Sequence, residues 1–321
     1  MNTAATSSAS ASVTAKPRTG VLVMAYGTPA SMDELEAYYT HIRHGRPPTP
    51  EALQDLRERY ESIGSSPLTE ITRAQLNGIA EHLPPDTPIA LGCKHVAPFI
   101  EDGVEELLAA GCDQIVGLVL APHFSTMSIG QYMGRAAEQA GDRATILPIE
   151  SWAREEGYIE LLAGFISDEL DAMRAKHPEL APDEIQVLIT AHSLPERILK
   201  VGDPYIEELT ATATLLAERL DLPRWQIAWQ SEGNTPDPWI GPDVLDAMPK
   251  HVDEGAKAVI VCSAGFVADH LEVLYDLDVE AADKARELGI PFARTAAPNA
   301  REDFCRMLAG VVRRTMPGVP A

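Results

Sequence analysis

Val21–Pro29 reads VLVMAYGTP, and Val187–Pro195 reads VLITAHSLP. Each stretch begins with apolar residues of the kind found in buried strands and ends in a turn that contains proline. The two stretches match position by position, and Tyr26 in the first stands where His192 stands in the second. We interpret them as equivalent strands of a duplicated α/β unit.

A second pair of stretches follows the first pair in the same order. Ile89–Leu91 precedes PFI and Val104, and Ile227–Trp229 precedes PWI and Val244; the matched residues are Pro98, Phe99 and Ile100 against Pro238, Trp239 and Ile240. Short apolar strands also match by chance, so the second pair supports the duplication without proving it.

Short β-branched runs alternate with longer helical patterns along the chain, which is typical of parallel sheets covered by helices. The expected strands are Gly20–Ala25, Ile89–Cys93, Ile115–Leu120, Ala144–Ile149, Ile185–Ala191, Gln226–Gln230, Ala258–Cys262 and Pro291–Arg294. Eight strands could form one sheet, but the repeat favours two. We therefore predict an α/β protein with two similar domains.

The expected boundaries follow from composition. Residues 1–18 are rich in Ala, Ser and Thr and are predicted to be a disordered tail without a secretory signal. The N-terminal domain is expected at 19–178 and the C-terminal domain at 179–300, joined near the proline-rich break KHPELAPD at Lys176–Asp183. Residues 301–321 are expected to form a helix that packs back on the first domain.

Length and charge restrict the function. The 321 residues suffice for two domains, and no apolar run approaches the ~20 residues that a membrane span needs. The net charge of −22 argues against a nucleic-acid surface and suits the attraction of cations. The four cysteines lack C-x-x-C spacing, which argues against a zinc or iron–sulfur site and favours buried thiols in a reducing cytoplasm.

Gly265–Glu280 reads GFVADHLEVLYDLDVE and places carboxylates four residues apart at Glu272, Asp276 and Glu280. On an α-helix this spacing stacks them along one face over about 12 Å. Like charges so placed repel one another, so the segment is either a track for cations or a solvated acidic face. His270 is too close in sequence to share the Glu272 face.

His192 directly follows a predicted buried strand, at the carboxyl end where open α/β sheets bind ligands. It can serve as a base or a metal ligand, or it can be a structural histidine bonded at a strand end. Two facing domains would bring Tyr26 and His192 to one cleft. With Glu272, His192 would form a site for a transient divalent ion, with too few ligands to hold it permanently.

Basic and aromatic residues gather in Tyr38–Arg46, YYTHIRHGR, and in the predicted helix that follows it. Arg43, Arg59 and Tyr60 could bind carboxylates of a flat ligand, since guanidinium pairs bidentately with carboxylate and also stacks. The same charges also suit a helix C-terminus. The chain has no G-x-G-x-x-G, no phosphate-binding G-x-x-x-x-G-K-[ST] and no G-x-S-x-G motif.

Six motifs, MAYGTP, YYTHIR, LAPHFST, TAHSLPE, SEGNTPDPW and GFVADHLEVLYD, resemble the ferrochelatase family, specifically its bacterial coproporphyrin-type enzymes. The resemblance extends from about Gly20 to Met316. It implies two Rossmann-like domains with a cleft between them, in which Fe²⁺ is inserted into a porphyrin without nucleotide hydrolysis. In two respects the chain departs from the family: the loop Ile63–Leu68 is one residue shorter, and His44 replaces a common arginine.

The resemblance also implies roles for single residues. His192 and Glu272 match the catalytic and metal-binding pair, and Asp276 and Glu280 match an outer or transit site for a hydrated ion such as Mg²⁺. The positions that match the porphyrin-binding residues of the family are Tyr26, Arg43, Arg59, Tyr60, Ser66 and Tyr132. Some relatives carry an iron–sulfur cluster, which the lone Cys305 near this C-terminus cannot support.

The activity implied is that of a lyase-class chelatase of haem biosynthesis, which inserts Fe²⁺ into coproporphyrin III to give coprohaem. The alternatives are a protoporphyrin IX ferrochelatase, a cobalt chelatase of a related tetrapyrrole, and a carrier that binds haem without making it. We expect porphyrin and ferrous iron as substrates, no required cofactor, no nucleic-acid partner, no integral membrane segment, a monomer and a cytoplasmic location.

The expected mechanism combines strain with proton removal. Bending the macrocycle turns its pyrrole lone pairs toward the incoming ion, which uses binding energy to approach the transition state. We hypothesise that His192 and Glu272 desolvate and position Fe²⁺ and that one of them accepts pyrrole protons, which leave along the carboxylates of Asp276 and Glu280. His192 is the favoured acceptor, and the division of the two tasks within the pair stays open.

Overall fold

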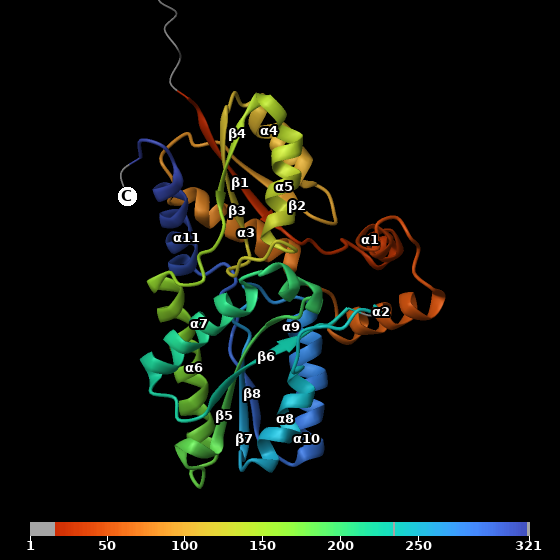
Figure 1. Cartoon of the computed structure of the whole chain (residues 1–321), viewed down its shortest axis with the longest axis vertical. Helices are drawn as coiled ribbons and strands as arrows, with labels where there is room; N and C mark the ends of the chain where they lie inside the picture. Colours follow the sequence, from red (N-terminus) through yellow and green to blue (C-terminus); the bar gives the residue numbers. More distant parts are fainter. Residues whose placement is uncertain (1–16, 234, 320–321) are drawn as a thin grey trace, which may run out of the picture.

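The computed structural model describes residues 17–233 and 235–319, which form two four-stranded parallel sheets (Figure 1). The first sheet has the order β2-β1-β3-β4 and the second the order β6-β5-β7-β8. The strands are β1 (Thr19–Ala25), β2 (Ile89–Cys93), β3 (Gln114–Val119), β4 (Thr145–Ile149), β5 (Ile185–His192), β6 (Trp225–Gln230), β7 (Ala258–Cys262) and β8 (Phe292–Arg294). All eight predicted strands are present, and the predicted fold class is confirmed.

The identical strand order in both sheets supports the duplication, with β1 and β5 as equivalent inner strands. The second match drawn from the sequence is wrong: its strand part is shifted by two residues and its proline part by four. Cys93 N donates to Pro98 O at 2.7 Å, and in the other half Trp229 N donates to Pro242 O at 3.0 Å, so Pro98 corresponds to Pro242 and not to Pro238. The loop before Pro242 contains two further prolines and the apolar pair Trp239–Ile240, so its sequence PWI resembles the PFI motif of the first half.

Helices cover both faces of each sheet. The helices are α1 (Leu35–Ile42), α2 (Pro50–Ser62), α3 (Leu68–Glu81), α4 (Ile100–Ala109), α5 (Ile129–Ala140), α6 (Glu156–Lys176), α7 (Tyr205–Leu220), α8 (Val244–Asp253), α9 (Leu271–Tyr275), α10 (Ala282–Leu288) and α11 (Glu302–Thr315). On the first sheet α4 and α5 oppose α3 and α11, and on the second sheet α6 and α7 oppose α8 and α10. Four 3₁₀ turns connect elements at Met32–Glu34, Gly141–Arg143, Pro182–Glu184 and Glu196–Val201.

Two helices pack on the sheet of the other half. Helix α6 precedes the predicted linker but contacts β7 and β8, whereas α11 follows β8 and contacts α3 and β4 of the first half. The domain boundaries expected from the sequence stay predictions, and most of the predicted tail, residues 1–16, lies outside the described residues.

A continuous apolar core extends through both sheets. At its centre Trp152 lies edge-on to Tyr158 with ring centroids 4.9 Å apart, and Phe304 of α11 lies 5.8 Å from Trp152. All three side chains are at most 2% exposed, and Tyr158 Oη donates to Ala264 O in the second half. Because this cluster contacts both halves, it fixes the two sheets relative to each other.

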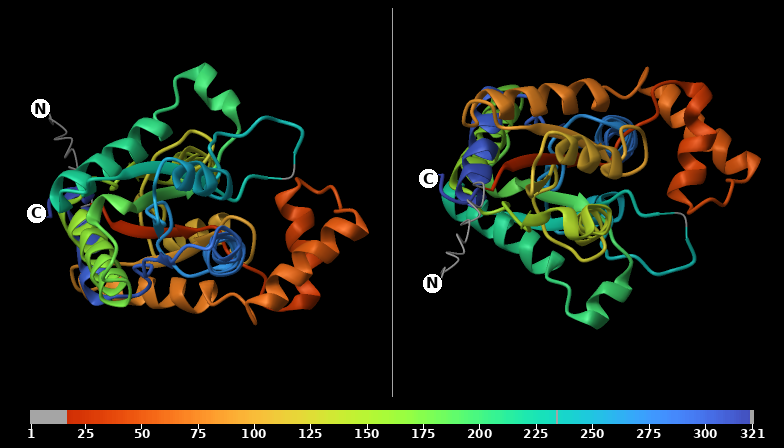
Figure 2. Two further views of the ribbon diagram at one scale, coloured as in Figure 1. Left: turned by 90° about the horizontal axis from the view of Figure 1, so that it is seen from below. Right: turned by 90° about the horizontal axis from the view of Figure 1, so that it is seen from above.

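Helices α1 and α2 form an arm to one side of the two sheets (Figure 2). Leu35, Tyr38 and Tyr60 form its small buried core, and α2 contacts α9 of the second half. The arm therefore places the aromatic and basic segment beside the acidic one. All four cysteines are buried and free, as expected. No helix in the described part of the chain is both long and apolar enough to span a bilayer.

Candidate active site

The duplication places two polar side chains at the carboxyl ends of equivalent strands. Tyr26 directly follows β1, and His192 ends β5. Glu272 comes from the first turn of α9, which follows β7, the strand beside β5. These three residues are far apart in sequence, and the charge of Glu272 contributes to the pKa shifts of both Tyr26 and His192. The fold thus brings His192 and Glu272 together, and the common cleft predicted for Tyr26 and His192 stays a prediction.

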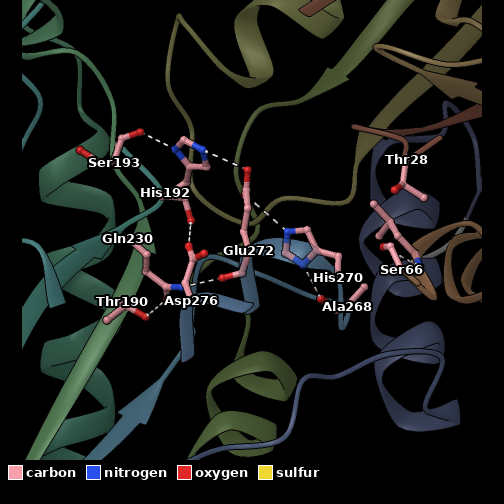
Figure 3. A network of polar contacts seen from close by, with 12 residues as sticks. Thr28, Ser66, Thr190, His192, Ser193, Gln230, Ala268, His270, Glu272 and Asp276 are labelled. Carbon is pink, nitrogen blue, oxygen red and sulfur yellow. Dashed lines mark hydrogen bonds and ion pairs between the residues drawn. The ribbon is translucent and has the colours of Figure 1, made fainter. Parts of the chain in front are cut away.

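Glu272 lies between two histidines (Figure 3). Its Oε1 is 3.4 Å from Nε2 of His192, and its Oε2 is 3.5 Å from Nε2 of His270. The other ring nitrogen of each histidine faces a main-chain carbonyl: Nδ1 of His192 donates to Ser193 O, and Nδ1 of His270 donates to Ala268 O at 3.0 Å. Because a carbonyl only accepts, both Nδ1 atoms carry hydrogen, and both Nε2 atoms are left to bind a proton or a metal ion.

The ionisation of this group is strongly coupled. Burial by itself lowers the pKa of His192, but the charge and hydrogen bond of Glu272, with smaller contributions from Ser193 and Asp276, raise it to about 9. Burial likewise raises the pKa of Glu272, but the charge of His192 and hydrogen bonds with both histidines hold it well below the usual range. Near neutral pH the metal-free pair is therefore an imidazolium beside a carboxylate, and a metal ion must displace a proton to bind.

His270 was not expected in this site, and its exclusion from the Glu272 face is wrong. The expectation treated it as part of the helix, where i and i+2 side chains diverge. His270 instead precedes α9 with an extended backbone, φ −161° and ψ −177°, so its ring turns back to the carboxylate. Within the described residues no set of three or more His, Cys, Asp or Glu side chains is already arranged to hold a metal ion. The three side chains here bond to one another instead.

The helix that carries the acidic residues is not a regular α-helix. Asp276–Ala281 form a π-helix between α9 and α10, so the four-residue spacing does not produce the simple stacked line that was predicted. Asp276 is nevertheless 8% exposed, which rules out a solvated face at this position. Ser231 Oγ donates to its carboxylate.

Asp276 titrates near neutral pH. Burial raises its pKa, the hydrogen bond from Ser231 opposes this, and the charges of Glu272 and Glu280 raise it further, to about 7. A pocket of about 300 Å³ lies over Asp276 and Glu280. Its other charged lining residues are Arg59, Glu232, Asp243 and Asp246. The two outer carboxylates thus lead from Glu272 to an acidic pocket.

Buried polar side chains hold the main chain of α9 in place. Gln230 ends β6, is fully buried and donates from Nε2 to Glu272 O at 2.9 Å. Thr190 of β5 donates to Gln230 Oε1 at 2.6 Å. No motif in the sequence indicates these two contacts, which require β5, β6 and α9 to meet in three dimensions.

Comparison with known proteins decides the family. A sequence model of the family described as ferrochelatase matches residues 18–316. The chain belongs to the ferrochelatase family. It is 46% identical over 310 residues to the coproporphyrin III ferrochelatase of Oceanobacillus iheyensis, covering 93% of this chain and 97% of that protein. It is 45% identical over 304 residues to the enzyme of the same name from Anoxybacillus flavithermus, covering 91% and 95%.

Solved structures agree on the fold. SirB from Bacillus subtilis, in a structure with Fe³⁺, matches with a TM-score of 0.58 over 94% of this chain and 96% of SirB, at 13% sequence identity. At that identity the likeness concerns the arrangement of the two sheets alone. It shows that the paired parallel sheets of this ferrochelatase also occur in a distant protein.

The residues predicted to bind porphyrin occupy different environments in this ferrochelatase, and their roles stay predictions. Tyr26 is 39% exposed, with its ring 4.6 Å from that of His95. Tyr60 and Tyr132 are each 5% exposed, and the hydroxyl groups Tyr60 Oη and Thr28 Oγ1 are hydrogen-bonded at 2.9 Å. Both tyrosines therefore form part of the packed wall of the site and do not extend freely into it. Desolvation of its hydroxyl group, followed by the charges of Glu272 and Tyr60, raises the pKa of Tyr26 above its usual range.

The remaining three candidates lie on the arm and beside it. Arg43 directly follows α1, with its guanidinium 5.7 Å from the Tyr39 ring centre. Arg59 lies over the ring of Tyr275 at 5.0 Å and lines the acidic pocket. Ser66 Oγ accepts a hydrogen bond from Leu68 N at 3.4 Å. Arg59 was predicted only as a porphyrin-binding residue, but it lies beside the acidic pocket that contains Asp276 and Glu280.

Lys94 is a basic residue that the sequence analysis missed. It follows β2, the neighbour of β1, and its Nζ donates to Gln131 Oε1 at 2.8 Å and lies 5.2 Å from the Tyr132 ring centre. Burial and the charge of Arg135 lower its pKa to about 8. Lys94 forms no salt bridge with a carboxylate in the part of the chain that the structure describes. Its position at a strand end, in C-K-H, is the signal that could have identified it.

Proposed function

We propose that this ferrochelatase inserts Fe²⁺ into coproporphyrin III and releases coprohaem. The observation that carries the proposal is the group formed by Glu272 and the Nε2 atoms of His192 and His270, which offers nitrogen and oxygen donors and a proton acceptor at one point. The near-complete coverage of the relatives named as coproporphyrin III ferrochelatases supports the choice of substrate.

The charge distribution is consistent with a porphyrin that carries four propionates. Lys94 and Arg43 are cations without a carboxylate partner among the described residues, and each lies beside an aromatic ring. Such residues suit an anionic, flat ligand, because they bind carboxylates and the adjacent ring packs on the macrocycle. Tyr26 and His192, from the two halves, would then lie on opposite faces of the macrocycle.

In the proposed mechanism the ion pair of His192 and Glu272 is the resting state. Fe²⁺ entering at Glu272 and His270 displaces the Nε2 proton of His192, which leaves through Asp276. As Fe²⁺ passes from these side chains to the pyrrole nitrogens, Nε2 of His192 becomes free again; it accepts one pyrrole N–H proton, passes it to Asp276 and then accepts the second. Two pyrrole protons leave in total as Fe²⁺ enters, so charge and atoms balance. Asp276, with a pKa of about 7, can accept each proton and release it toward Glu280 and the acidic pocket.

An outer ion fits the same carboxylates. The oxygen donors of Asp276 and Glu280 suit a hard cation such as Mg²⁺, which retains several waters and needs few protein ligands. Such an ion would neutralise the acidic pocket and keep both carboxylates ionised, so Asp276 relays protons only while the ion is absent. We propose no resident cofactor beyond it, and Fe²⁺ is a substrate. We further propose that the protein is a monomer. We also propose a cytoplasmic location, with which the four buried free thiols are consistent.

The activity is tested by mixing the protein anaerobically with Fe²⁺ and coproporphyrin III and following the absorption bands of the free-base porphyrin. We expect their iron-dependent loss, faster than with protoporphyrin IX at equal concentration. A porphyrin spectrum that shifts on binding but does not lose the free-base bands with iron would indicate a carrier instead.

A further inference from the structure

Arg294, at the end of β8, holds two segments that flank the Glu272 helix. Its Nε and Nη2 donate to the two carboxylate oxygens of Asp278 at 2.7 and 2.9 Å. Its Nη1 lies 3.3 Å from Oδ1 of Asp269. Asp269 precedes α9 and Asp278 lies in the π-helix, so one guanidinium connects the residues on either side of the segment that carries Glu272 and Asp276. The Arg294 side chain is only 16% exposed.

Asn299 holds Asp269 from the opposite side. Asp269 N donates to Asn299 Oδ1 at 2.8 Å, and Asn299 Nδ2 donates to Asp269 Oδ2 at 2.7 Å. The backbone of Asn299 is left-handed with φ +48°, a conformation that asparagine tolerates better than most residues. The amide and Oδ2 of Asp269 are therefore hydrogen-bonded to Asn299, while Oδ1 is buried without a hydrogen-bond partner and lies beside the Arg294 guanidinium, which leaves the residue before His270 little freedom to move.

This network is also tied to the first half of the chain. Gln75 of α3 is fully buried, and its Nε2 donates to Val267 O at 3.1 Å and to Asn299 O at 3.0 Å. Asn299 N in turn donates to Val267 O at 2.9 Å. The loop that leads into α9 is thus fixed against both sheets.

We propose that Arg294 and Asn299 are positioning residues that set the distance of Glu272 and His270 from His192 through Asp269 and Asp278. The inference rests on the proposed function and deepens it. Within the part of the chain that the structure describes, neither residue forms a hydrogen bond or ion pair with the three reacting side chains, so both act through the main chain. Metal sites commonly depend on such outer contacts, whose loss costs about 10- to 100-fold in affinity or activity.

The planar shape of the Arg294 guanidinium matters as well as its charge. Arg294 makes a bidentate contact with Asp278 and a third contact with Asp269, which a lysine ammonium cannot reproduce from one position. Arg294→Lys keeps the charge between the two carboxylates and removes this fork. Asn299→Gly removes both side-chain contacts to Asp269 and accommodates the left-handed backbone without strain.

The test compares both variants with Arg286→Gln, which breaks an exposed pair with Asp283 on α10. We expect Arg294→Lys and Asn299→Gly to lose about tenfold or more in kcat/KM for Fe²⁺ while the KM for coproporphyrin III stays within about twofold. Arg286→Gln should match the wild type in both. Should Arg294→Lys fail to fold, Asn299→Gly carries the test.

A Co²⁺ titration followed by visible absorption gives a readout that does not depend on turnover. We expect both variants to bind Co²⁺ about tenfold more weakly than the wild type and to change the d–d bands that report the ligand geometry. Folded variants with wild-type Co²⁺ affinity and wild-type Fe²⁺ kinetics, or with a lowered Tm only, would overturn the proposal. A wild type that binds Co²⁺ but inserts no iron would contradict the proposed function and leave the Co²⁺ comparison as the test of positioning.

Discussion

Nε2 of His192 lies 3.4 Å from Oε1 of Glu272, although the two residues follow different strands and are separated by the whole of β6 and β7. The contact unites the end of an inner strand with the first turn of a helix from the neighbouring strand. It also creates the coupled titration on which the proposed exchange of a proton for a metal ion depends. The duplicated strand order places Tyr26 in the equivalent position of the other sheet.

Metal affinity should rise with pH. The folded pKa of His192, about 9, lies above its ordinary value of 6.5, so its ion pair stabilises the fold fully below pH 6.5, and that contribution is lost as pH rises through 9. A metal ion must displace the same proton, so Co²⁺ affinity should increase by up to about tenfold per pH unit over this interval. Calorimetric titrations from pH 6.5 to 9 measure this. A flat affinity would contradict the assigned ion pair.

The outer carboxylates should matter less than Glu272. We expect Glu272→Gln to lower kcat by about 100-fold or more, since it removes a ligand and the charge that holds the His192 proton. Asp276→Asn should cost about tenfold, because it removes a proton acceptor outside the reacting group, and Glu280→Gln less than that. Steady-state kinetics with Asp283→Asn as the exposed control rank the variants. Equal losses in Asp276→Asn and Glu272→Gln would refute the division of roles.

Lys94 should contribute to porphyrin binding alone. Replacing it by methionine keeps the packing on Tyr132 and removes the charge, so the KM for coproporphyrin III should rise about fivefold or more at an unchanged KM for Fe²⁺. Lys284→Met, at an exposed pair on α10, is the matched control. An increase in the KM for Fe²⁺ of the same size would show that Lys94 acts on the metal site instead.

The aromatic cluster between the sheets should carry a large share of the stability. Phe304→Ala leaves a cavity against Trp152 and Tyr158 and should lower the free energy of unfolding by about 3–5 kcal/mol. Val201→Ala, at a side chain that is 73% exposed, should change it by less than about 0.5 kcal/mol. Urea denaturation followed by circular dichroism measures both. A loss below about 1 kcal/mol for Phe304→Ala would mean that the cluster does not join the two halves.

The sequence was sufficient for the strands and for the central pair, for a physical reason. Parallel strands buried on both faces read as continuous apolar runs, as β7 does from Ala258 to Cys262, and ligands collect at their carboxyl ends. His192 and Glu272 therefore stood out by position. The register of the second pair of matched stretches could not be predicted, because the prolines before Pro242 offer several equally good matches.

What could not be predicted depends on local backbone geometry and long-range contacts. The spacing of Glu272, Asp276 and Glu280 fits an α-helix, and nothing in it signals the π-helix that begins at Asp276. His270 enters the site because its backbone is extended before α9. Gln230 and its partners bond across elements that are distant in the chain, and no local pattern reports such contacts.

The most direct test of the central claim is the single-turnover rate of iron insertion by His192→Ala, measured anaerobically with enzyme in excess over coproporphyrin III. If His192 exchanges its proton for the metal ion and then accepts pyrrole protons, the variant should bind the porphyrin with unchanged affinity and insert Fe²⁺ about 100-fold or more slowly than the wild type. Insertion at a rate near that of the wild type, with intact porphyrin binding, would contradict the account.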